Sequence, residues 1–175
     1  MHNLHFVVVE AETGEDACSE AGSQIEDWGT ENNWWVTCGA ISAEGKTYKS
    51  PDGGRWEVEE NMTVEEVKKT AAGWLFGTDD FMEKSFKKVI AKFTAGKEKM
   101  DSGDWYIIKR YAEEQGDRCW AAMKLKGEPE LTAENYDPFY KGYRSYKFDE
   151  CGITVLCDEA TPKEKRWIVF LDMHS

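Results

Sequence analysis

Histidine is scarce in this chain of 175 residues: His2, His5 and His174 are its three copies, and they lie near the two ends. A pair of histidines on neighbouring strands can perform phosphoester chemistry or hold a metal ion. If the first and last strands were neighbours, His5 and His174 could form such a pair. Neither carries the H-x-T/S pattern typical of two-histidine phosphoester chemistry, so we favour a structural role for both.

Cysteine gives no recognisable framework either. The five cysteines are odd in number and contain no CxxC pair, which favours reduced thiols in a cytosolic protein. The longest apolar run near the N-terminus, Phe6–Val9, is far too short for a secretion signal or a membrane span. We therefore expect a cytoplasmic protein without a membrane partner.

The motifs of several enzyme classes are also missing. The chain has no D-x-D-x-D-G calcium loop and no signature of a catalytic serine or cysteine, and Gly53-Gly54 is not followed by the Lys-Ser/Thr of a phosphate loop. Pro51-Asp52 and Glu57-Val58-Glu59 fit part of the nuclease pattern PD…(D/E)xK, but Glu59 stands where the lysine belongs. We name no catalytic residue, metal ligand or cofactor, and a metal-dependent nuclease or phosphodiesterase is the third alternative.

What the chain does have is acidic charge, concentrated in its first third. Residues 1–60 carry 13 Asp and Glu against three Lys and Arg, whereas residues 61–175 carry 21 against 19, within a net charge of −12. Such a field repels long nucleic acid and anionic membranes and attracts basic protein surfaces. The charge therefore predicts a basic protein partner.

Apolar residues make up 41% of the chain and aromatic residues 13%, which indicates a folded domain despite the charge. We predict one α+β domain over residues 1–175: an antiparallel or mixed sheet, with an N-terminal amphipathic helix and a central helical hairpin (63–96) packed on it. The helices are expected at 11–28 and within 63–96, where Thr63 and Glu66 form a capping box. The expected strands are 5–10, 34–42, 46–50, 55–59, 104–113, 118–126, 153–157 and 166–173, with a helix as the alternative for 104–115 and irregular structure over 127–142.

The first helix has an acidic face. Residues four apart in a helix are separated by a rise of about 6 Å, which is comparable to the spacing of phosphates along a nucleic-acid strand. Such a ladder can occupy the groove of a nucleic-acid-binding protein, although any solvated helix of an acidic protein has a similar face. Exposed tryptophans next to it would add an apolar anchor and leave a homodimer compatible with the sequence. The proposed partner-binding residues are Glu12, Asp16, Glu20, Asp27, Glu31, Trp34 and Trp35.

Residues 136–148 combine six aromatic side chains with three cations and one acid. Aromatic rings stack on bases and neighbouring cations meet phosphates, so this composition suits a small nucleotide. The alternative is a loop whose rings anchor it to the core. The candidate ligand-binding residues are Tyr140, Lys141, Tyr143, Arg144 and Tyr146.

Two short segments resemble bacteriophage proteins. The stretch Val7–Trp35, with VVVEAET, EDA and QIEDWGTENNWW, and the later GGRW at 53–56 are similar to small uncharacterised phage-encoded proteins. The resemblance covers about a quarter of the chain and implies an accessory protein that acts inside a bacterium, where inhibitors of host defence are often small acidic binders.

These observations lead to one expectation and its alternatives. We expect a protein that is not an enzyme and that binds and inhibits a host nucleic-acid-handling or defence protein through its negatively charged surface. A binder that sequesters a small nucleotide signal is the second reading.

Overall fold

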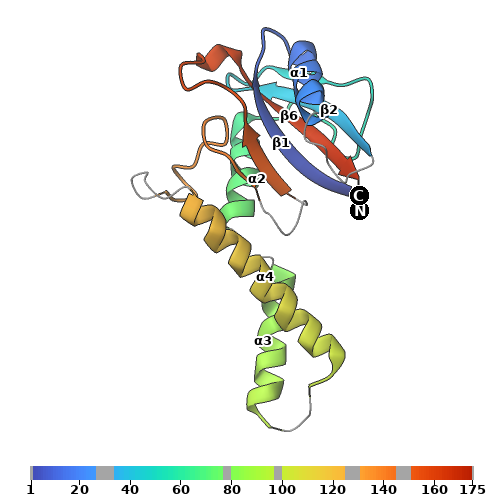
Figure 1. Ribbon diagram of the computed structural model, residues 1–175, viewed down its shortest axis with the longest axis vertical. Coiled ribbons are helices and arrows are strands. Elements are labelled where there is room, and N and C mark those ends of the chain that lie inside the picture. The colour runs from blue at the N-terminus through green and yellow to red at the C-terminus, as the bar shows by residue number, and fades with distance from the viewer. Residues whose placement is uncertain are drawn as a thin grey trace.

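A computed structural model describes residues 2–26, 34–76, 80–96, 100–124, 131–144 and 151–174 of the chain. Its body is a six-stranded mixed sheet in the order β3-β2-β6-β1-β5-β4, from which a helical hairpin projects (Figure 1). This architecture confirms the predicted α+β class. The elements are β1 (His2–Glu10), α1 (Gly14–Glu26), β2 (Trp34–Ser42), β3 (Thr47–Lys49), α2 (Val64–Phe76), α3 (Asp80–Thr94), α4 (Ser102–Lys124), β4 (Tyr143–Arg144), β5 (Cys151–Val155), a 3-10 turn (Lys163–Lys165) and β6 (Arg166–His174).

Strand β1 lies in the middle of the sheet, and both of its faces are covered. It pairs antiparallel with β6 and parallel with β5, and its seven inner residues are all buried. A strand buried on both sides reads as a continuous apolar run, which explains the sequence FVVV. The first and last strands are therefore neighbours, as the histidine hypothesis required.

Each face of the sheet has its own hydrophobic core. Phe6, Ile168 and Phe170 point to one face, where they pack with α2 and with Tyr136 and Phe139. The alternate residues of the same strands, such as Val7 and Val169, point to the other face and pack with α1. Period-two alternation thus assigns one helix to each side of the sheet.

Helix α2 begins at the predicted capping box. The Thr63 backbone N–H donates to the Glu66 carboxylate at 2.7 Å, and the Glu66 N–H donates to the Thr63 hydroxyl at 3.3 Å. The apolar side of α2 lies on the sheet, with the Trp74 ring 4.6 Å from that of Phe6. The two helices expected over 63–96 are present as α2 and α3, but the predicted hairpin of these two on the sheet is wrong: α2 packs on the sheet, whereas α3 packs on α4, away from the sheet.

The predicted β-hairpin of 104–113 and 118–126 is wrong, because residues 102–124 form the single helix α4. Asp101 caps this helix: its carboxylate accepts the Asp104 N–H at 2.9 Å, and the Asp104 carboxylate accepts the Asp101 N–H at 3.0 Å. The Tyr111 ring stacks on Phe86 of α3 at 4.2 Å, and Lys92 pairs with Asp104 at 2.8 Å. Capping and interhelical packing outweigh the strand preference of the β-branched and aromatic residues near position 107.

The predicted strand 55–59 is also wrong. Gly53 and Gly54 have positive φ values of 74° and 137°, which turn the chain out of strand geometry. The Arg55 N–H then donates to the buried carboxylate of Asp172 at 3.0 Å instead of to a neighbouring strand. The segment is held against the sheet by this contact and by the buried Val58 side chain.

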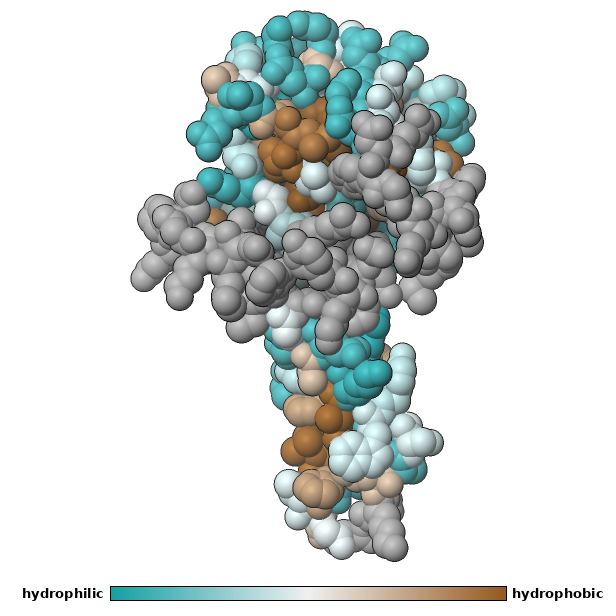
Figure 2. Space-filling view, viewed as in Figure 1, coloured by the Kyte–Doolittle hydropathy of each residue, from teal (hydrophilic) through white to brown (hydrophobic). Residues whose placement is uncertain are grey.

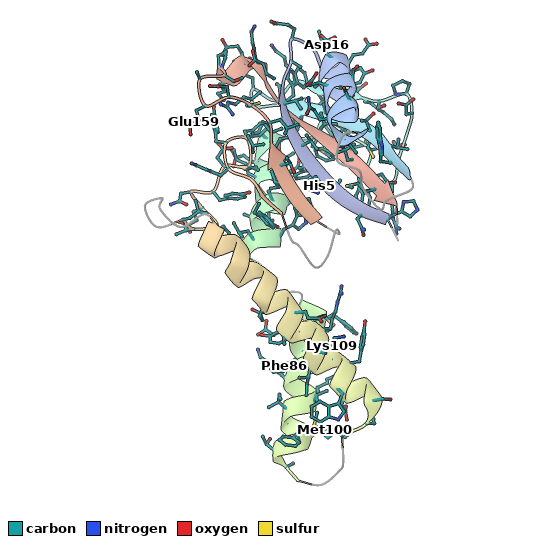
Figure 3. All side chains as sticks on the ribbon, viewed as in Figure 1. His5, Asp16, Phe86, Met100, Lys109 and Glu159 are labelled. Atoms are coloured by element: carbon teal, nitrogen blue, oxygen red, sulfur yellow. The ribbon has the colours of Figure 1, made fainter. Side chains whose placement is uncertain are left out.

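The hairpin of α3 and α4 presents hydrophobic side chains to solvent (Figure 2). Phe81, Phe93, Trp105 and Tyr106 are each more than half exposed. The hairpin has a small core of its own, which includes the stacked rings of Phe86 and Tyr111, and it extends well beyond the sheet (Figure 3).

Candidate functional site

The acidic surface is built on α1, the helix that covers one face of the sheet. Thr13 caps the helix, because its hydroxyl accepts the Asp16 N–H at 3.1 Å and donates to the Asp16 carboxylate at 2.7 Å. Ala17, Ala21 and Ile25 are buried against the sheet. The opposite side of α1 must therefore face solvent, and it is where the acidic residues lie.

The structure shows part of the predicted acidic ladder on α1. Asp16 and Glu20 are exposed and four residues apart on α1, and Asp16 lies at the end of the body away from the hairpin (Figure 3). Glu12, however, precedes the helix, and its carboxylate pairs with Lys165 at 2.5 Å. Asp27 and Glu31 lie outside the described residues, so the ladder on the described part of α1 consists of Asp16 and Glu20.

Glu15 was missing from the prediction and belongs to the same surface. It is exposed on the first turn of α1 beside Asp16. In the described part of the chain, no lysine or arginine lies within ion-pair distance of Glu15, Asp16 or Glu20. We call these three residues the α1 acidic face; their carboxylates have no counter-charge within the described fold.

Trp35, the predicted apolar anchor, is half-buried and packs on α1. A Cβ atom on Gly22 would lie 2.9 Å from the edge of the Trp35 ring, so glycine is required for the helix to approach this closely. The side chain of Trp34 lies outside the described residues. The apolar part of the candidate site is therefore Trp35, held by α1.

A cleft of about 470 Å³ opens between α1 and the strands β2 and β3. Its walls include Trp35 and Tyr48, and the Cβ of Tyr48 lies so close to Gly14 that a side chain at this position would collide with it. Glu15 borders it on α1, and Asp52 borders it on the turn after β3. We call this the α1–β3 cleft; it was not predicted, because Asp52 was considered only as a turn residue and as part of an incomplete nuclease pattern.

The buried side of the cleft holds a cysteine. Burial raises the pKa of the Cys18 thiol to about 12, and the negative charge of Asp52 adds to this effect. Burial, and then the charge of Glu15, raise the pKa of Tyr48. Both groups are therefore neutral at physiological pH, and the charge of the cleft comes from Glu15 and Asp52.

The aromatic–basic segment, residues 136–148, makes several contacts with the rest of the fold in its described part. The Tyr140 ring lies 4.2 Å from the guanidinium of Arg166, which is fully buried, and the Tyr136 hydroxyl donates to the Lys141 carbonyl at 2.8 Å. Tyr143 is half-buried in β4, the side chain of Arg144 is not among those described, and Tyr146 lies outside the described residues. Tyr140 therefore stacks on a protein cation, which is the anchoring alternative for this ring.

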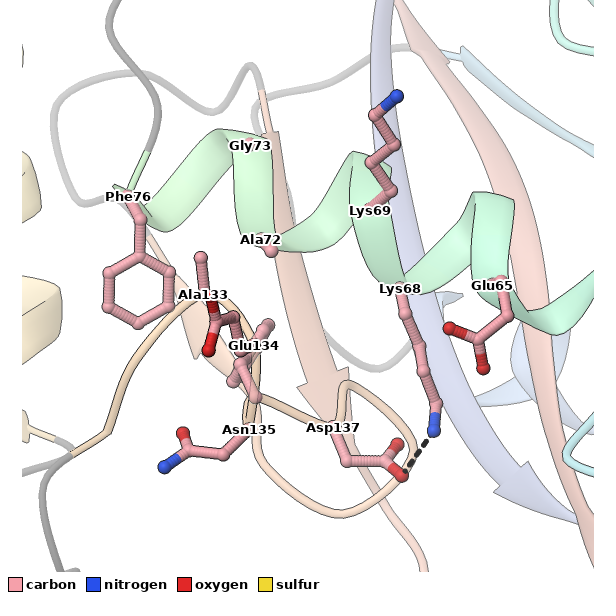
Figure 4. A pocket seen from close by; sticks show the side chains of 11 residues that line it. Glu65, Lys68, Lys69, Ala72, Gly73, Phe76, Ala133, Glu134, Asn135 and Asp137 are labelled. Atoms are coloured by element: carbon pink, nitrogen blue, oxygen red, sulfur yellow. Dashed lines mark ion pairs between the residues drawn. The ribbon is translucent and has the colours of Figure 1, made fainter.

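A second cleft, of about 570 Å³, lies between α2 and residues 133–137 (Figure 4). Lys68 crosses it and pairs with Asp137 at 3.0 Å. Glu65, Lys69 and Glu134 also line it. Its lining thus contains both signs of charge, unlike that of the α1–β3 cleft.

The histidines do not form the pair considered above. The strand register sets His2 opposite His174 and His5 opposite Leu171, so His5 and His174 lie on opposite faces of the sheet. His2 contacts Asp172 at 2.8 Å, and His5 is buried with its Nε2 atom 3.0 Å from the Thr154 hydroxyl. Among the described residues, no group of three or more His, Cys, Asp or Glu side chains is placed to hold a metal ion.

Within the described ranges, no helix combines the length and apolar character needed to cross a membrane. Comparisons with protein-family models, with curated proteins and with solved structures find no match to this chain. The candidate site accordingly rests on the chain's own geometry.

Proposed function

We propose that this protein is a non-enzymatic binder that inhibits a basic, nucleic-acid-handling protein through the α1 acidic face. We further propose, on the resemblance noted in the sequence of residues 7–35, that this partner lies in the cytoplasm of a bacterial host. The observation that supports the proposal most strongly is the α1 acidic face itself: three exposed carboxylates with no cation of the described chain within ion-pair distance.

Physical arguments connect this surface to such a partner. Asp16 and Glu20 lie one above the other on a helix whose other side is fixed to the sheet, so their carboxylates are presented on a rigid support. A rigid array loses little conformational entropy when it binds. A groove that binds nucleic acid is lined with lysine and arginine, and an acidic ladder can satisfy those cations in place of phosphates.

The test is a capture experiment with charge-reversal variants. The tagged protein and the double variant Glu15→Lys/Glu20→Lys are used as baits in bacterial lysate; this variant leaves the Thr13–Asp16 cap intact. Glu59→Lys/Glu60→Lys is the matched control, because it changes the net charge equally and both residues are exposed and lie apart from α1. Bound proteins are quantified by mass spectrometry at low and high salt.

We expect a basic nucleic-acid-binding protein that the wild type and the control capture at low salt and release at high salt, because exposed charges are screened beyond about 8–10 Å at physiological ionic strength. The α1 variant should lose it. Equal capture by the two double variants would count against the α1 acidic face. A co-purifying nucleotide without a protein partner would favour the sequestration reading instead.

A further inference from the structure

We propose that the α1–β3 cleft receives one arginine side chain of the basic partner. This inference rests on the proposed function, which supplies the partner's basic character, and it adds the residue type that is recognised and the place where it binds.

The charge of the cleft suits a cation. The cleft is lined by two carboxylates and by no lysine or arginine. Glu15 and Asp52 belong to different elements, α1 and the turn after β3, so they approach the cleft from two sides. Neither has an ion-pair partner within the described residues. A cation that enters the cleft would therefore be the counter-charge that this part of the fold lacks.

Two aromatic side chains line the cleft. Trp35 and Tyr48 pack against the core on the α1 side of the sheet, and Gly22 and Gly14 let them approach α1 closely because a Cβ atom at either position would collide with these side chains. These rings are consequently positioned before any ligand arrives. Cations are attracted to aromatic rings, most strongly to tryptophan, and a planar guanidinium can also stack on them.

Hydroxyl groups favour arginine over lysine in this cleft. The hydroxyls of Ser19 and Ser23 lie on exposed residues of α1, whereas those of Thr37 and Ser50 are buried and 3.5 Å apart, in contact with each other. A guanidinium carries five N–H donors in a planar fork, whereas an ammonium carries three on a compact, strongly hydrated head. Acceptors spread around an aromatic-walled cleft suit the planar fork better.

The experiment uses two dye-labelled peptides, one alternating glycine with arginine and one alternating glycine with lysine. Fluorescence anisotropy at low salt gives their dissociation constants for the full-length protein. Asp52→Asn and Glu15→Gln test the cleft. Glu59→Gln is the matched control, because it removes one exposed carboxylate on the other side of the sheet. Circular dichroism verifies that each variant is folded.

We expect the arginine peptide to bind several-fold more tightly than the lysine peptide. Asp52→Asn and Glu15→Gln should each weaken the arginine peptide by about two- to five-fold, the range for exposed cation contacts, and should reduce the preference over lysine. Glu59→Gln should leave both peptides unchanged.

Two results would overturn the inference, and they can be told apart. If both peptides bind equally and Asp52→Asn behaves like Glu59→Gln, the cleft does not select arginine, although the α1 acidic face can still bind basic partners. If the wild type binds neither peptide, the proposed function fails together with the cleft.

Discussion

Arg166 offers the sharpest test of how the fold is held together beside the aromatic–basic segment. It is only 1% exposed, and among the described residues its hydrogen-bond partners include no carboxylate. Instead, the guanidinium donates to backbone carbonyl oxygens of two separate loops, at Thr161, Phe139, Asp158 and Glu159, over distances of 2.7 to 3.3 Å. Replacing it with methionine keeps an unbranched side chain but removes every one of these donors.

The expected cost follows from the burial of the acceptors. Thr161 and Phe139 are buried, so leaving their carbonyl oxygens without a donor would cost about 1–3 kcal/mol of folding stability each. The carbonyl oxygens of the exposed Asp158 and Glu159 can instead accept hydrogen bonds from water. Loss of the stacking on Tyr140 adds about 1 kcal/mol. Methionine avoids the desolvation of a buried charge, which offsets part of the loss. We expect Arg166→Met to lower the free energy of unfolding by about 3 kcal/mol.

Urea unfolding followed by circular dichroism measures this change. Lys165→Met is the matched control, since it removes the adjacent cation, whose pairing with Glu12 is exposed and therefore contributes little to stability. If Arg166→Met falls within about 1 kcal/mol of Lys165→Met, the carbonyl contacts are not the anchor that their geometry indicates.

Three further outcomes follow from other parts of the fold. Hydrogen bonds from Thr63 lower the pKa of Glu66. The Glu66 carboxylate therefore stabilises the fold at pH values above its ordinary pKa of 4.5, and this stabilisation is lost as the pH falls through the lowered pKa. Glu66→Gln should accordingly reduce the melting temperature at neutral pH, and the difference in melting temperature from the wild type should disappear in acid. A difference that persists at low pH would contradict this assignment. With a pKa of about 12, Cys18 should react with iodoacetamide about a thousandfold more slowly in the native protein than in urea, as peptide mass spectrometry can show; equal rates would mean that the thiol is not buried. Phe86→Ala should lower the free energy of unfolding by about 2 kcal/mol through the lost stacking on Tyr111, and it should speed amide hydrogen exchange in α3 and α4 more than in the sheet. Equal acceleration of exchange in both parts would show that the hairpin and the sheet unfold together.

Much of the fold could be predicted because local signals and tertiary packing agree. The run at Phe6–Val9 becomes the central strand, and the box of Thr63 and Glu66 starts α2 where expected. The β-hairpin prediction for residues 102–124 was wrong because the aromatic and β-branched residues of this segment favour strands. The helix that forms instead begins at the pair Asp101 and Asp104, which caps it. A D-x-x-D pattern could have indicated this cap.

The candidate site was less predictable. Helical periodicity correctly predicted that Asp16 and Glu20 lie on the exposed side of α1, because residues four apart share one face of a helix. It could not find Asp52 or Tyr48, which reach the α1–β3 cleft only because β3 folds back beside α1. The contact of Tyr140 with Arg166 was not predicted either, because the two residues are distant in sequence. Contacts of this kind depend on strand order, which local patterns do not encode.

Carboxylate footprinting tests the central claim most directly. The captured partner is mixed with the protein, exposed carboxylates are coupled to an amine with a carbodiimide, and modified peptides are quantified by mass spectrometry with and without the partner. The account predicts that Glu15, Glu20 and Asp52 lose modification in the complex, while Glu59 and Glu60 keep it. Unchanged modification on α1, with protection of Glu59 and Glu60 instead, would place the contact on the other face of the sheet and contradict the account.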